Sequence, residues 1–191
     1  RIEHFGSEGD RYLGGENLLQ LIAFEVYRQN IEVCRKESIV FSTPSEIKSI
    51  SSELKGYVNS SQEARLNLKL MMEKLRPFWE ENGEEEDSEF QISVFDSTGE
   101  MKSNLKFEVD FDKLKEILSE RIEKGIRQFF SSLKNVFQAR YLDKTKDVAD
   151  INIFLAGNSS KSHLVMELFK KHIDFYNNEL SESSGKKKNW I

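Results

Sequence analysis

Hydrophobic residues recur every three or four positions along several stretches of the chain, and alternate with polar residues along others. The first spacing is typical of helices with one buried face, and the second is typical of strands. We therefore expect helices over residues 16–30, 44–57, 60–76, 110–137 and 164–173, and strands over residues 1–5, 89–96, 101–109 and 151–155.

Local signals refine the ends of these elements. Ser60 precedes Glu63 by three positions, which matches a capping box and predicts that a helix begins there. Pro77 is expected to limit this helix, because a proline pushes the residue before it away from helical angles. Asp110 or Asp112 is expected to cap the longest helix. The acidic loop over residues 82–88 and the polar stretch past Asn178 are expected to be solvated and frayed, respectively.

Composition narrows the class of protein. The 191 residues carry a formal net charge of −5, which argues against nucleic acid or an anionic membrane as a partner. The single cysteine, Cys34, excludes an internal disulfide and fits a reducing compartment, so we expect a cytoplasmic protein. Because the sequence opens at Arg1 without an initiator methionine, we expect a fragment of something longer.

Two glycine-containing turns and one helix face are candidates for a ligand site. Gly14 and Gly15 precede a helix, so backbone can approach a ligand closely there, although a purely structural turn explains them as well. A second turn, residues 156–160, joins an apolar strand to a helix. Glu73 and Arg76 stand three positions apart, and so project from one face of a helix as a candidate pair or as an ordinary surface ion pair.

In order and content these segments resemble the second lobe of the ATPase domain of DnaK-type chaperones, the seventy-kilodalton heat-shock family within the actin-like ATPases. Residues 9–17, Gly-Asp-Arg-Tyr-Leu-Gly-Gly-Glu-Asn, are similar to the family's G-D-x-x-L-G-G-E-D motif. Residues 68–76 resemble its adenosine-facing helix. Residues 153–161 resemble its second adenosine motif, from which Ala156 and Ser160 depart.

The resemblance implies a site for ATP or ADP. Gly15 and Glu16, with Gly14 before them, would approach the ribose and the phosphates. Glu73 would accept hydrogen bonds from the ribose hydroxyls, and Arg76 would lie along the adenine. The other face of the base would be lined by Gly157, Asn158 and Ser159. The family's stacking arginine falls on Ser160 here, and either Arg76 or Lys161 would substitute for it.

The implied fold is α/β, a partial ribonuclease-H-like lobe of the actin-like ATPase type with an inserted α+β helical subdomain. Residues 1–43 and 140–178 would form the incomplete base of the lobe, residues 44–139 the inserted subdomain, and residues 179–191 a polar tail. The family's base has two further central strands upstream of Arg1. We therefore expect either an incompletely ordered base or a sheet completed by a neighbouring molecule.

The implied function is the adenosine-binding half of the nucleotide cleft of an ATP-dependent molecular chaperone. The expected partners are an adenine nucleotide and a co-chaperone or exchange factor on the inserted subdomain. The family's phosphate- and Mg²⁺-holding hairpins lie upstream of this segment, so the chain alone is not expected to hydrolyse ATP. Two alternatives stay open: a non-enzymatic helical protein-interaction module, and a lobe of another actin-like ATPase, such as a filament former or a sugar kinase relative.

Overall fold

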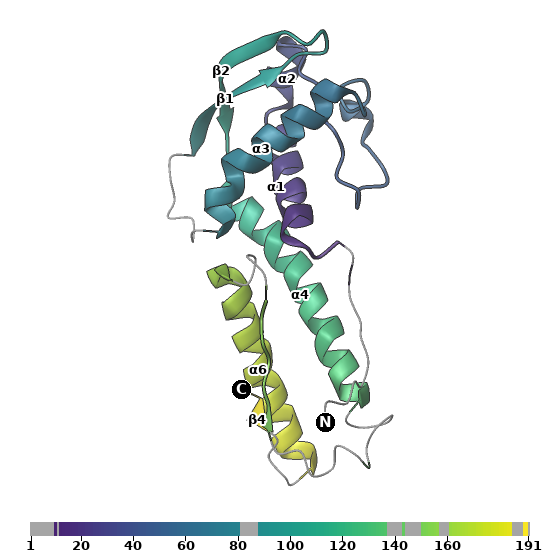
Figure 1. The fold of residues 1–191 in the computed structure, drawn as a ribbon, viewed down its shortest axis with the longest axis vertical. Helices are drawn as coiled ribbons and strands as arrows, with labels where there is room; N and C mark the ends of the chain where they lie inside the picture. Colours follow the sequence, from purple (N-terminus) through teal and green to yellow (C-terminus); the bar gives the residue numbers. More distant parts are fainter. Residues whose placement is uncertain are drawn as a thin grey trace. The chain divides into compact units, whose positions relative to one another are not determined.

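The computed structural model describes residues 10, 12–80, 88–136, 143, 150–156, 161–184 and 189–190. Both helices and strands are present, so the fold is mixed α/β (Figure 1). The chain divides into two units, one of residues 12–118 and one of residues 1–11 with 119–191. These units do not coincide with the expected division into residues 1–43 with 140–178, residues 44–139 and residues 179–191.

Two helices form the centre of the unit of residues 12–118. Helix α1 (Gly15–Gln29) agrees with the predicted helix, and α3 (Gln62–Glu80) packs across it (Figure 1). The apolar residues of α1 recur at helical spacing and form one buried face, which explains why this segment is helical. Short α2 (Ile31–Lys36) follows. The buried side chains of the two long helices include Leu18, Leu19, Ile22, Ala23, Val26, Tyr27, Ala64, Leu68, Met71, Leu75 and Trp79.

An antiparallel hairpin, β1 (Glu89–Phe95) and β2 (Met101–Glu108), packs on α3. Both strands confirm the predictions for residues 89–96 and 101–109. Gly99 lies in the connecting turn with φ of 89°, a conformation that glycine adopts without the steric cost of a side chain. The inward-facing side chains Ile92, Val94 and Phe107 are buried, so the hairpin closes the core over the helices.

Two buried asparagine amides join the helices to this hairpin. Asn30 Nδ2 donates to the Glu108 carbonyl at 2.8 Å, and the Glu108 N–H donates to Asn30 Oδ1 at 2.8 Å. Asn67 Nδ2 donates to the Phe95 carbonyl at 2.6 Å, and the Phe95 N–H donates to Asn67 Oδ1 at 2.7 Å. Asn67 Nδ2 also donates to the carbonyl of Val40 at 2.8 Å. These bonds position α3 against the end of β1.

The prediction of a helix over residues 44–57 is wrong. Only a single 3₁₀ turn, η1 (Ser52–Leu54), forms in this stretch, and Gly56 leaves helical angles at φ of 95°. The apolar spacing is present, but Ser49, Ser51 and Ser52 are poor helix formers, because their hydroxyls compete with backbone hydrogen bonds. The segment is instead an irregular loop with one face toward α1.

Helix α3 is capped one residue later than predicted, and it ends later than predicted. Ser61, not Ser60, caps it, since the Ala64 N–H donates to Ser61 Oγ at 3.1 Å. Pro77 lies inside the helix, which continues to Glu80. Beyond the proline, Trp79 is buried, and the rings of Phe78 and Phe111 lie 4.9 Å apart. This packing outweighs the local preference to stop at Pro77.

The long helix α4 (Phe111–Asn135) starts in the unit of residues 12–118 and continues into the other unit. Asp110 caps it as predicted, because the Lys113 N–H donates to Asp110 Oδ1 at 2.9 Å. In the second unit its Phe130 ring stacks on Tyr176 of α6 (His163–Ser184) at 4.5 Å. Helix α6 extends past Asn178, where the polar stretch was expected to start.

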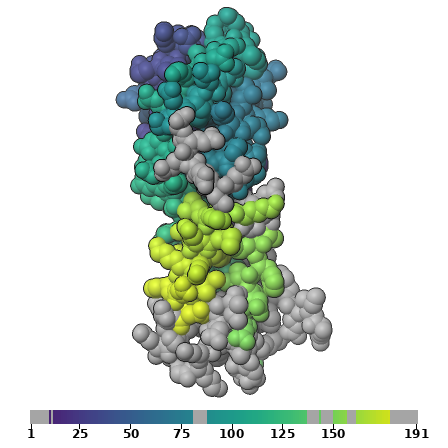
Figure 2. Space-filling view, turned by 90° about the vertical axis from the view of Figure 1, so that its left-hand side faces the viewer, coloured from purple at the N-terminus to yellow at the C-terminus, as the bar shows by residue number. Residues whose placement is uncertain are grey.

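Helix α6, yellow-green to yellow in Figure 2, exposes two large apolar side chains. Met166 and Phe175 are 53% and 55% exposed.

Among the described residues, none of the helices is both long and apolar enough to cross a membrane.

The predicted buried strand over residues 151–155 is wrong. Strand β3 (Asp150–Ile151) has only two residues, paired in parallel with β4 (Asn189–Trp190), and Phe154 is 90% exposed. A strand is buried only when neighbours cover it, and no sheet of more than two strands occurs in the described part of the chain. The predicted strand over residues 1–5 and most of the acidic loop, residues 81–87, lie outside the described residues.

Candidate functional site

The first candidate motif forms the start of α1. Gly14 is the N-cap, and its carbonyl accepts hydrogen bonds from the N–H groups of Asn17 and Leu18 at 2.9 and 3.1 Å. Gly14 has an extended conformation open to any residue, and an added Cβ would meet only Asn17 Nδ2, at 3.6 Å. The fold therefore does not itself require glycine at this position. Glu16 follows in the first turn of α1, where the helix dipole favours a carboxylate.

The second candidate motif lies on one face of α3. Glu73, Arg76 and Glu80 follow one another at spacings of three and four, so their side chains meet on the helix surface. Glu80 is on this face only because α3 continues through Pro77.

Arg76 joins the two motifs. Its Nη1 donates to Glu16 Oε1 of α1 at 2.8 Å and to Glu80 Oε1 at 3.2 Å. Its Nη2 and Nε donate to the two carboxylate oxygens of Glu73 at 2.9 and 3.2 Å. We call these four residues the Arg76 cluster. The structure thus brings together three of the residues predicted for the site, Glu16, Glu73 and Arg76, from positions 60 apart in the chain.

The cluster lies at the surface and is acidic. The side chains of Glu16 and Glu73 are 64% and 56% exposed, whereas Arg76 is 27% exposed. Hydrogen bonding from Arg76 lowers the pKa of Glu73, and the hydrogen bonds to Glu73 and then Glu16 raise the pKa of Arg76. Three carboxylates face one guanidinium, so the cluster has a net negative charge at neutral pH.

This arrangement favours hydroxyl groups over anions as ligands. Ionised carboxylates only accept hydrogen bonds, so their exposed oxygens can bind the hydroxyls of a sugar. The net negative charge opposes a phosphate at the same place. A guanidinium is planar, and when several carboxylates fix its orientation it offers a face on which a planar ring can stack.

The remaining predicted residues are placed separately or are not described. Gly157, Asn158 and Ser159 lie outside the described residues. Lys161 is exposed just before α6, in the unit of residues 1–11 and 119–191. In that same unit Asp10 of the first motif accepts a hydrogen bond from Arg121 Nη2 at 2.8 Å, and both side chains are largely buried. The convergence of all the predicted residues on one ligand therefore stays a prediction.

Sequence reasoning missed Glu80. Its position four residues after Arg76 would have identified it as an ion-pair partner, had the helix not been predicted to end at Pro77.

Among the described residues, no group of three or more histidine, cysteine and acidic side chains could hold a metal ion.

Comparisons with known proteins found no match: no protein-family model, no curated protein and no solved structure is significantly similar to the chain.

Proposed function

We propose that the Arg76 cluster binds the nucleoside part of an adenine nucleotide, as the adenosine-binding half of a cleft in a DnaK-like, ATP-dependent chaperone. The observation that carries the proposal is the ion pair between Arg76 and Glu16. These two residues belong to motifs that are distant in the sequence, and the resemblance assigns both to the same ligand. Their contact on one surface is what a shared site requires.

The chemistry of the cluster supports the nucleoside as its ligand. Glu73 keeps exposed carboxylate oxygens toward solvent while Arg76 holds its orientation with two hydrogen bonds. A carboxylate fixed in this way can accept hydrogen bonds from neighbouring hydroxyls, such as those of ribose, with little loss of side-chain freedom. Because the cluster is acidic, the phosphates would point away from the carboxylates of Glu16, Glu73 and Glu80.

This proposal also supplies a role for Gly14 and Gly15 at the start of α1. Gly14 is not required by the local packing, and a helix start without a side chain leaves backbone accessible to a ligand. Phosphoryl transfer needs a metal and groups that cradle the phosphates. We propose that these groups come from outside this chain, and that the chain alone binds adenosine weakly without turnover.

A titration of the ¹⁵N-labelled chain with adenosine, followed by amide chemical shifts, tests the proposal. We expect shifts centred on residues 14–17 and 73–76, and weaker shifts with 2′,3′-dideoxyadenosine, which lacks the ribose hydroxyls. Glu73→Gln keeps the side-chain shape but removes the charge, and should weaken binding severalfold. The matched control is Glu63→Gln, on the same helix and outside the cluster. Equal binding of the two nucleosides, or equal affinity of the two variants, would show that the cluster is not the ribose site.

A further inference from the structure

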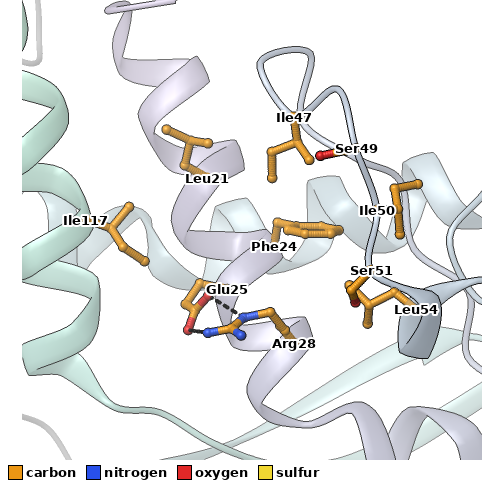
Figure 3. Close-up of a pocket in the computed structure, with 10 residues that line it drawn as sticks. All are labelled: Leu21, Phe24, Glu25, Arg28, Ile47, Ser49, Ile50, Ser51, Leu54 and Ile117. Carbon is orange, nitrogen blue, oxygen red and sulfur yellow. Dashed lines mark hydrogen bonds and ion pairs between the residues drawn. The ribbon is translucent and has the colours of Figure 1, made fainter.

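A second candidate site is a groove along residues 21–28 of α1, whereas the Arg76 cluster uses Glu16 at the start of this helix. The groove has a volume of about 350 Å³ and is lined by four residues of α1: Leu21, Phe24, Glu25 and Arg28. These positions recur at spacings of three, one and three, so they form a continuous strip along the helix. Figure 3 shows this strip between Ile117 of α4 and the loop that carries Ile47, Ile50 and Leu54.

The body of the groove is apolar. Six hydrophobic side chains line it: Leu21, Phe24, Ile47, Ile50, Leu54 and Ile117. A volume of 350 Å³ stands at the lower end of the range for small-molecule sites, which are mostly apolar with a few placed polar groups. The groove therefore suits a small apolar body, such as a medium-length alkyl chain or a single ring.

One polar group in the lining is prepared for a further ligand. Arg28 Nε donates to Glu25 Oε2 at 2.8 Å, and Arg28 Nη2 donates to Glu25 Oε1 at 2.9 Å. This pairing uses the side edge of the guanidinium, formed by Nε and Nη2. The end edge consists of Nη1 and the second hydrogen of Nη2, and in the described part of the chain no hydrogen bond engages it.

The unused edge has the geometry that binds a carboxylate. Two parallel N–H groups of a guanidinium match the two oxygens of a carboxylate, which gives a bidentate pair. The largely buried Glu25 fixes the orientation of Arg28, so little conformational freedom remains to be lost on binding. The same hydrogen bonds to Glu25 raise the pKa of Arg28, with a smaller contribution from the charge of Glu53.

We propose that this groove binds a small amphipathic carboxylate, with its apolar body along Phe24 and its carboxylate on the end edge of Arg28. The groove shares no residue with the Arg76 cluster. The proposal therefore does not depend on whether the chain binds adenosine.

Octanoate is the probe for this proposal, added to the ¹⁵N-labelled chain and followed by amide chemical shifts. We expect shifts at residues 21–28 and 47–54, and binding tighter than that of octanol, which has the same body without the carboxylate. Arg28→Lys keeps the charge and loses the bidentate edge, so it should weaken octanoate about tenfold. Arg65→Lys is the matched control, an arginine of α3 outside the groove, and should leave affinity unchanged.

A second variant tests the apolar wall without disturbing a helix. Ile50→Asp places a carboxylate in the irregular loop, and should abolish octanoate binding while leaving the circular dichroism spectrum unchanged. Glu53→Gln removes a repelling charge near Arg28 and should tighten binding. The proposal is overturned if octanoate does not bind, if octanol binds as tightly, or if Arg28→Lys and Arg65→Lys have the same affinity. Weaker octanoate binding in Glu53→Gln would likewise overturn it.

Discussion

Replacing Asn67 by leucine should destabilise the unit of residues 12–118 by about 3 kcal/mol. Leucine has the same branching and the same number of side-chain heavy atoms as asparagine, although its methyl groups are bulkier, so the change removes the hydrogen bonds without opening a cavity. Three bonds of 2.6 to 2.8 Å are lost, to the Val40 carbonyl and to both backbone groups of Phe95. Each buried polar group left without a partner costs about 1–3 kcal/mol, and we take the lower figure for each of the three.

Urea unfolding followed by the fluorescence of Trp79 measures this loss. Trp79 is buried in α3, and replacing Trp190 by phenylalanine leaves it as the only tryptophan, because the chain has two. Lys69→Ala on the exposed side of the same helix is the control, and should change the free energy of unfolding by no more than about 0.5 kcal/mol. If Asn67→Leu costs no more than this control, the amide does not anchor α3, and our account of how the helix is positioned fails.

Three further changes test other parts of the fold. The hydrogen bonds from the Thr98 hydroxyl and from backbone N–H groups lower the pKa of Asp96 to about 2, so the carboxylate contributes stability above pH 4 that is lost as the pH falls toward 2. Asp96→Asn should therefore flatten the dependence of the urea midpoint on pH between those values. Asp110→Ala should cost about 1 kcal/mol through loss of the α4 cap, and Asp110→Ser should restore most of it, as measured by the same unfolding curves. Pro77→Ala should raise the free energy of unfolding, by up to about 3 kcal/mol, since alanine restores the missing N–H within α3; an unchanged midpoint would mean that the proline is already accommodated.

Periodicity predicted those elements whose residues specify them locally. α1, the β1–β2 hairpin and α4 formed where the hydrophobic spacing placed them, and Asp110 caps α4 as its position suggested. Their buried faces are wide and continuous, so few alternatives compete with them.

The errors in the length of α3 and in the list of site residues arose because distant contacts override local preference. Helix α3 continues through Pro77 because Phe78 and Trp79 pack beyond it, and neither contact can be inferred from spacing along the helix. The same error removed Glu80 from the candidate site. Asn67 gave one usable signal, a polar residue within the apolar face formed by Ala64, Leu68 and Met71. The contact of Arg76 with Glu16 joins positions 60 residues apart, and only the resemblance assigned them to one site.

The two asparagine amides also protect the hairpin from pairing with other chains. A two-stranded sheet has an outer edge on each strand, and unpaired backbone groups there can recruit a further strand. Asn30 forms hydrogen bonds with the N–H and the carbonyl of Glu108 on β2, and Asn67 does the same with Phe95 on β1. A slip of either strand by one residue would turn its groups inward and leave the oxygen of the facing amide buried without a donor, although Asn30 Nδ2 would keep its bond to Val26 and Asn67 Nδ2 its bond to Val40. The helices thereby fix the register of the hairpin and at the same time block a point on each edge where aggregation could begin.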